Sequence, residues 1–153
     1  ALLWLHCSKD GTIMKNRNVI SVVGGVKHER HIAEKCVAHM IDKLMPRMKT
    51  LDIEVEIKNI PGSAIGYCDM QDTNREFTLE IQKGLTLKEL VTTVVHEMIH
   101  VKQYARKEMD VEGKTWKRCF VVEGTGYYDL PWEKEAYRLQ DKYAQSVWDA
   151  DIL

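Results

Sequence analysis

The sequence predicts a single α+β domain in which helices pack against a small, mainly antiparallel sheet. The chain has 153 residues, 44% hydrophobic and 29% charged, which suits one globular domain with a real core. Two segments alternate apolar and polar residues, as half-buried strands do, and three others carry apolar residues at helical spacing. The domain is expected to span residues 1–153, with residues 1–27 the segment whose pattern is least readable.

Composition excludes several classes of partner. The formal net charge of -1 gives no basic field, so neither a nucleic acid nor an anionic membrane is the expected partner. No stretch approaches the roughly 18 apolar residues of a membrane span. The start at Ala1–Cys7 lacks a basic region, and its apolar run is shorter than the roughly seven residues of a signal peptide. The cysteines, which form no Cys-x-x-Cys pair, are expected to be free thiols in a reducing, cytoplasmic compartment: Cys7, Cys36, Cys68 and Cys119.

The first half of the chain predicts a strand, a helix and a second strand. Residues 19–23 are rich in valine and isoleucine and end at Gly24-Gly25, which indicates a strand. Residues 28–45 carry apolar side chains at helical spacing, and Pro46 stops this helix. Residues 53–57 then alternate isoleucine or valine with glutamate, the pattern of a half-buried strand.

The second half predicts two more strands and two helices. Strands are expected over residues 64–70 and, with clear alternation, over 77–81. Thr86-Leu87-Lys88-Glu89 is a capping box, so a helix should begin there and run to about Arg106. Residues 107–130 are expected to be irregular. Pro131 suits a first helical position and opens a last helix through about Trp148.

The motif that carries chemistry is His96-Glu97-Met98-Ile99-His100, inside the capped helix. Histidines four residues apart project from one helix face, so two neutral ring nitrogens can share one zinc ion. Glu97 lies about 100° round the helix, where it can reach a metal-bound water and accept its proton. A chance match in a chain of this composition has a probability on the order of 2%. The alternative is two histidines packed at a helix surface with a surface glutamate between them.

A catalytic zinc site needs a third protein ligand. Gln103 and Arg106 stand where a metzincin would have glycine and histidine, and no histidine follows His100. A downstream third ligand must therefore be a carboxylate, and the candidates are Glu112, Glu123, Glu133 and Glu135.

The last helix distinguishes two of these candidates. Its apolar residues define one face: Trp132, Ala136, Leu139, Tyr143 and Val147. On a helical wheel Glu133 falls within this face, whereas Glu135 points well away from it. A glutamate on a buried face needs a partner, which favours Glu133 as the ligand. The alternative is a solvated carboxylate in the first helical turn.

These residues resemble a known family. Residues 96–104 resemble the active-site helix of SprT-like and related small zincin metallopeptidases. Residues 127–136 resemble the downstream glutamate segment of compact phage and bacterial members, and Glu133 stands three residues before Ala136, as in the broader gluzincin pattern. The resemblance covers about residues 75–145. It implies a minimal zincin-like domain that hydrolyses peptide bonds, with Zn²⁺ as cofactor and a protein or peptide as substrate, in the cytoplasm (the host cytoplasm for a phage protein).

The resemblance also implies roles for individual residues. His96, His100 and Glu133 would hold the zinc ion, and Glu97 would be the general base. The strand at Phe77–Ile81 would be the edge strand that binds an extended peptide. Tyr127 or Tyr128 could donate to the oxyanion, although simple aromatic packing is the alternative for each tyrosine.

The chain also departs from the family. Members of the Spartan type have a third histidine in the loop after the active-site helix, where this chain has Glu112, which is therefore a rival ligand. It has neither a cysteine-rich zinc ribbon nor a basic tail, so repair of DNA–protein crosslinks does not transfer. Two further hypotheses are a catalytically silent zincin-fold module that binds peptides and a metal-free scaffold protein.

Overall fold

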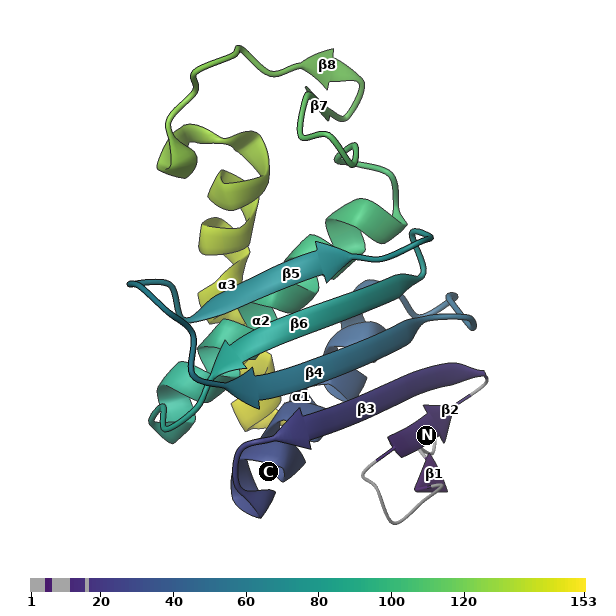
Figure 1. Ribbon diagram of the computed structural model, residues 1–153. Coiled ribbons are helices and arrows are strands. Elements are labelled where there is room, and N and C mark those ends of the chain that lie inside the picture. Colours follow the sequence, from purple (N-terminus) through teal and green to yellow (C-terminus); the bar gives the residue numbers. More distant parts are fainter. Residues whose placement is uncertain (1–4, 7–11, 16) are drawn as a thin grey trace.

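The computed structural model of the protein describes residues 5–6, 12–15 and 17–153 (Figure 1). Its elements are, in chain order, β1 (Leu5–His6), β2 (Thr12–Lys15), β3 (Asn18–Gly24), α1 (Lys27–Leu44), β4 (Asp52–Lys58), β5 (Gly66–Met70), β6 (Glu76–Gln82), α2 (Leu87–Ala105), β7 (Thr115–Trp116), β8 (Cys119–Phe120), the 3₁₀ helix η1 (Tyr127–Asp129) and α3 (Pro131–Asp149). The α+β class is confirmed, and each helix and strand expected from the sequence is present. Cys7 and most of the apolar start lie outside the described residues.

The large sheet is mixed, with strand order β1-β2-β3-β4-β6-β5. Its central strands β3, β4 and β6 are parallel, and antiparallel pairing occurs only toward the two edges. This differs from the mainly antiparallel sheet expected from the sequence. The reason is the connections: α1 crosses from β3 to β4, and such a crossover joins parallel neighbours.

The edge strand that contacts α2 is β5. The prediction that Phe77–Ile81 forms the edge strand is wrong, because this segment is β6 and lies inside the sheet. The chain leaves β4, returns as β5 on the outside, and then inserts β6 between these two strands. Ile81 therefore pairs with Ile57 of β4 on one side and with Gly66 of β5 on the other. Alternation in the sequence identifies a half-buried strand but carries no information about which strand becomes its neighbour.

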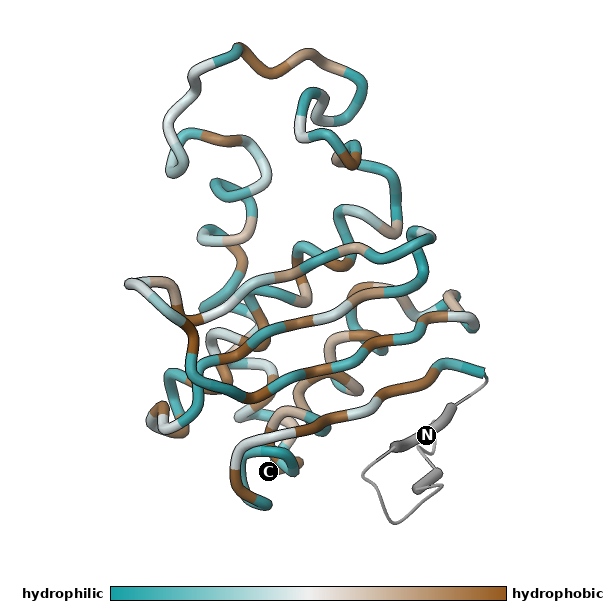
Figure 2. Tube along the Cα trace, viewed as in Figure 1, coloured by the Kyte–Doolittle hydropathy of each residue, from teal (hydrophilic) through white to brown (hydrophobic). Residues whose placement is uncertain are grey.

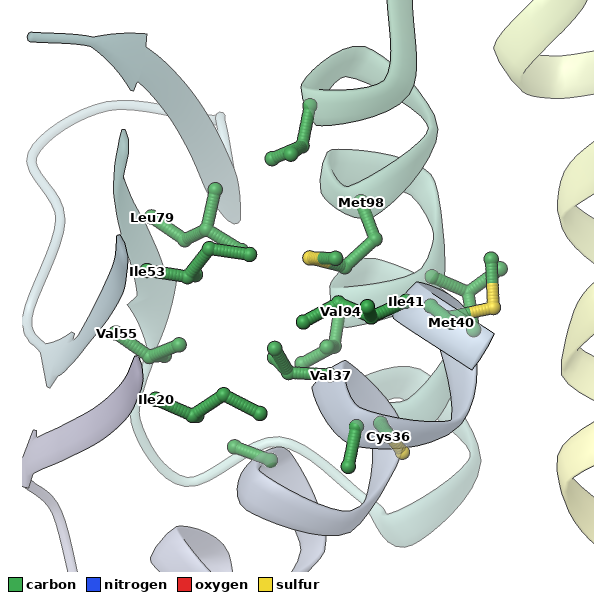
Figure 3. Close-up of a cluster of buried hydrophobic side chains, with 14 of the residues drawn as sticks. Ile20, Cys36, Val37, Met40, Ile41, Ile53, Val55, Leu79, Val94 and Met98 are labelled. Carbon is green, nitrogen blue, oxygen red and sulfur yellow. The ribbon is translucent and has the colours of Figure 1, made fainter. Parts of the chain in front are cut away.

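The core lies between one face of the sheet and the helices α1 and α2. Alternate residues of β4 and β6 point to this face and are at most 2% exposed, whereas their glutamates lie on the opposite face. Figure 2 shows the matching alternation of hydrophobic and hydrophilic residues along both strands. Figure 3 shows sheet residues such as Ile53 and Leu79 facing Val37 of α1 and Met98 of α2.

Helix α2 begins where the sequence predicts, because the capping box is formed. The Thr86 hydroxyl accepts a hydrogen bond from the Glu89 N–H (3.2 Å), and the Glu89 carboxylate accepts one from the Thr86 N–H (2.9 Å). Helix α3 packs mainly against α2 (Figure 1). Residues 107–126, which include the β7–β8 hairpin, form an arm that connects these two helices. Among the described residues, no helix is sufficiently long and apolar to cross a membrane.

Candidate metal centre

Three buried side chains from two helices meet at one point. His96 and His100 project from α2, and Glu133 projects from the first turn of α3, and each residue is at most 8% exposed. Nε2 of His96 lies 3.1 Å from Oε1 of Glu133, and Nε2 of His100 lies 3.1 Å from its Oε2. The two Nε2 atoms are 3.2 Å apart. The structure therefore brings together the three residues that the sequence analysis selected.

These separations suit a metal ion. Four ligand atoms at about 2.1 Å from a tetrahedral zinc ion lie about 3.4 Å from one another, close to the spacing of this group. Potential ligand atoms of His96, His100 and Glu133 all lie within 4.8 Å of each other. Two imidazoles and one carboxylate are a donor set that zinc accepts, and they leave one position for water.

Two glutamines fix which ring nitrogen of each histidine carries the hydrogen. Oε1 of Gln140 lies 2.8 Å from Nδ1 of His96, and Oε1 of Gln103 lies 2.7 Å from Nδ1 of His100. A carbonyl oxygen can only accept, so both Nδ1 atoms must donate. In the neutral rings both Nε2 atoms then present lone pairs to each other and to Glu133.

Such an arrangement requires positive charge at its centre, from either a metal ion or a proton. Burial favours the neutral ring of His100, but the carboxylates of Glu133 and Glu97 together outweigh this effect and raise the pKa of His100. Burial likewise opposes ionisation of Glu133, yet the contacts with His100 and His96 lower its pKa to about 2. The carboxylate therefore stays ionised, as a metal ligand must.

Glu97 lies beside this group under the edge strand. Its side chain is buried, and in the part of the chain that the structure describes its carboxylate has no hydrogen-bond partner. Burial raises the pKa of Glu97, although the nearby His100 and His96 act in the opposite direction. A Cβ atom on Gly66 of β5 would lie 3.0 Å from Oε1 of Glu97 and 2.8 Å from Cγ2 of Thr93. Glycine at this position thus lets the strand approach the carboxylate closely.

The two tyrosines proposed for the oxyanion lie at different distances from the ligands. The Tyr127 hydroxyl donates a hydrogen bond to Oε1 of Glu133 (3.0 Å). Tyr128 is 72% exposed, and its ring packs edge-on against Tyr127 at a centroid distance of 5.1 Å. Tyr127 is therefore the tyrosine that contacts the His96–His100–Glu133 group.

The rival glutamates lie outside the group. The side chain of Glu112 is 69% exposed and pairs with Lys114, and Glu123 is also exposed. Glu135 was expected to point away from the buried face, and this expectation is wrong, since it is 8% exposed. Its carboxylate lies 2.7 Å from Nζ of Lys102, so an ion pair from α2 covers this side of α3. The helical wheel took into account only the apolar residues of the last helix. It could therefore not predict that an ion pair with Lys102 of α2 would bury Glu135.

Sequence reasoning missed two residues that support the histidines. Gln103 is fully buried, and its Nε2 donates to the Trp132 carbonyl (3.0 Å) and to Glu135 (3.3 Å), which fixes the amide orientation toward His100. Spacing offered a signal for both residues. Gln103 follows His100 by three positions and Gln140 follows Glu133 by seven, so each lies on the same helix face as the ligand that precedes it.

Two clefts meet at Glu97. The first encloses about 410 Å³ and runs from His96 and Glu97 along the start of β5 to Tyr128 and Tyr137. The second encloses about 320 Å³ and extends past His100 toward Tyr104 and Trp132. Both are lined by Gly66, Glu97 and Tyr127, so an extended chain laid along β5 would pass over the Glu97 carboxylate.

Comparison of the chain with protein-family models, with curated proteins and with solved structures gave no match.

Proposed function

We propose that the protein is a zinc-dependent peptidase with a zincin-like active site of the SprT-like or compact gluzincin type. The observation that carries the proposal is the convergence of two Nε2 lone pairs and the Glu133 carboxylate on one point. Zinc lowers the pKa of a bound water and polarises a carbonyl, which is the chemistry that hydrolysis of an amide needs. His96, His100 and Glu133 would hold this ion, and Gln140 and Gln103 would keep the two rings in the required tautomer.

Glu97 has the properties of a general base. Its carboxylate is buried next to the ligand group, lines both clefts and is not engaged in a hydrogen bond within the described residues. In the proposed reaction Glu97 accepts a proton from the attacking water and passes it to the amine that leaves. A catalytically silent peptide-binding module has no use for a carboxylate buried beside the metal ligands, so this feature favours an enzyme.

The substrate in this proposal is an extended peptide. Strand β5 is the edge of the sheet, lines the second cleft with Gly66, Tyr67 and Cys68 and reaches the first cleft at Gly66. Its edge backbone groups can therefore pair with a peptide strand. The Tyr127 hydroxyl, now bonded to Glu133, would donate to the carbonyl oxygen as negative charge develops there. Cys36, Cys68 and Cys119 form no disulfide, which agrees with the proposed cytoplasmic location.

Elemental analysis and a peptidase assay test the proposal together. We expect about one zinc ion per wild-type chain and a loss of bound zinc in His96→Ala and Glu133→Ala. Glu112→Ala is the matched control, because this exposed glutamate lies outside the group and should leave zinc content unchanged. Glu97→Gln should keep the zinc but lose hydrolysis of a denatured protein substrate. Wild-type protein without zinc after reconstitution, or full activity in Glu97→Gln, would contradict the proposal.

A further inference from the structure

A row of aromatic rings leads from the candidate metal centre along one wall of the first cleft. The ring of His96 lies 4.7 Å from that of Tyr137, which in turn lies 5.7 Å from that of Tyr128 (centroid distances). Tyr128 is 72% exposed and Tyr137 is 42% exposed. Aromatic surface thus remains uncovered in a concave place, where a ligand would bury it.

The cleft carries almost no charge. Apart from His96 and Glu97, which belong to the site, its lining residues are all uncharged and include Tyr127, Tyr128, Tyr137 and Gln140. A charged side chain that entered it would lose water without gaining an ion-pair partner beyond the catalytic carboxylate, which is unfavourable. A neutral side chain incurs no such penalty.

The size of the cleft suits a large side chain together with its backbone. Its volume of about 410 Å³ falls within the roughly 300–1,000 Å³ of small-ligand sites. An aromatic side chain could pack against Tyr128 and Tyr137 in an offset or edge-to-face arrangement, which adds to the gain from apolar burial. The second cleft differs, because two carboxylates, Glu97 and Glu133, line it.

We infer that the first cleft binds a neutral aromatic side chain of a peptide substrate beside the bond to be cut, with Tyr128 and Tyr137 as the specificity-determining residues. The inference rests on the proposed function, because it assigns the substrate class of that same site. The side chain is selected by ring packing and by the exclusion of charge, while the backbone pairing with β5 is independent of sequence.

Peptide binding to a zinc-loaded Glu97→Gln variant tests the inference without requiring turnover. The probes are four fluorescein-labelled peptides of alanine that differ only in a central Phe, Leu, Lys or Glu. Fluorescence polarisation should give the tightest binding for Phe and binding about ten-fold weaker or worse for Lys and Glu, as expected for one lost aromatic contact together with an unpaired charge.

The same measurement on Tyr128→Ala and Tyr137→Ala, each combined with Glu97→Gln, identifies the residues responsible. Both changes should reduce the preference for Phe over Lys to less than about three-fold. Phe120→Ala is the matched control, since Phe120 is 88% exposed on the arm and does not line the cleft. Because Tyr137 packs on His96, the zinc content of each variant is measured as well. The exposed Tyr128 can be replaced without disturbing the core.

The outcomes separate this inference from the proposed function. Equal affinity for all four peptides, preference for Lys or Glu, no binding, or an unchanged preference for Phe in both tyrosine variants would overturn the inference. Hydrolysis of the Phe peptide by the wild type is scored separately. Selective binding without any hydrolysis would reject the proposed peptidase activity and support the assignment of the cleft. Hydrolysis without selectivity would support the peptidase activity and reject the assignment of the cleft.

Discussion

Nδ1 of His100 lies 2.7 Å from Oε1 of Gln103, one helical turn further along α2. The amide is held in place because its Nε2 donates to the Trp132 carbonyl and to Glu135, both in α3. The orientation of a candidate metal ligand in one helix therefore depends on contacts with the next helix. Packing of α3 on α2 thus positions both Glu133 and the imidazole that faces it.

Replacement of Gln103 by leucine should weaken metal binding. The change removes the acceptor of His100 Nδ1 and leaves a buried N–H without a partner, which costs about 1–3 kcal/mol of folding free energy. Loss of such a partner typically lowers metal affinity about 10–100-fold. Competition with a chromogenic chelator gives the affinity, and urea unfolding of the metal-free protein gives the stability.

Gln140→Leu is the natural comparison for that experiment. Gln140 makes the equivalent contact with His96 but is only half-buried, so water can replace it in part. Its effect on zinc affinity should have the same sign and be smaller. Wild-type affinity in Gln103→Leu would show that the amide does not orient the ligand.

Gly66→Ala should impair catalysis while zinc stays bound. The added methyl group would lie 2.8 Å from Cγ2 of Thr93 and 3.0 Å from Oε1 of Glu97, so the Glu97 carboxylate has to shift. A displacement of about 1 Å in an active site can lower the rate about 10²-fold. We expect such a loss in kcat with unchanged zinc content. Addition of Thr93→Ser removes the closest methyl group and should restore part of the activity, and unaltered kcat in Gly66→Ala would refute the steric argument.

The stability of the protein should fall at high pH through Cys36. This thiol is fully buried, and burial raises its pKa from 9.0 to about 12. Between these two values the unfolded chain loses the thiol proton while the folded chain keeps it, so the free energy of unfolding decreases as pH rises, by up to about 1.4 kcal/mol per pH unit. Urea unfolding at several pH values above about 8 should show a steeper decline in wild type than in Cys36→Ala. Parallel curves would mean that the thiolate is not excluded from the core.

Much of the fold could be predicted from local patterns. The alternation in 53–57 and 77–81 identified two strands, and the capping box at Thr86 gave the start of α2 correctly. Strand order could not be predicted in this way, because it depends on contacts between distant segments. The insertion of β6 between β4 and β5 is such a contact, and it gives the edge of the sheet, where a peptide is proposed to bind, to β5 rather than to 77–81.

The residues of the candidate site likewise fall into those that a local pattern could predict and those that depend on contacts between distant segments. His96, Glu97 and His100 could be selected from one helical motif, and Glu133 from its place on the apolar face of α3. Tyr137 and Gly66 could not be found, because they contribute only through the packing of α3 and β5 around α2. Glu135 was placed on the wrong side, since its burial comes from a partner charge in α2 rather than from apolar neighbours.

Glu133 and Glu135 provide a matched pair for a final test, because both are buried acids in the same turn of α3. Glu133→Gln removes an ionised ligand and should abolish or greatly weaken zinc binding. Glu135→Gln leaves the three ligand side chains in place but weakens the ion pair with Lys102, so zinc should stay bound at saturating metal. The loss should appear in the folding free energy of the metal-free protein, at about 1.5–3 kcal/mol for a hydrogen bond to a charged group. Elemental analysis and urea unfolding of the two variants in parallel decide the matter: loss of zinc from Glu135→Gln and its retention in Glu133→Gln would exchange the roles of the two carboxylates.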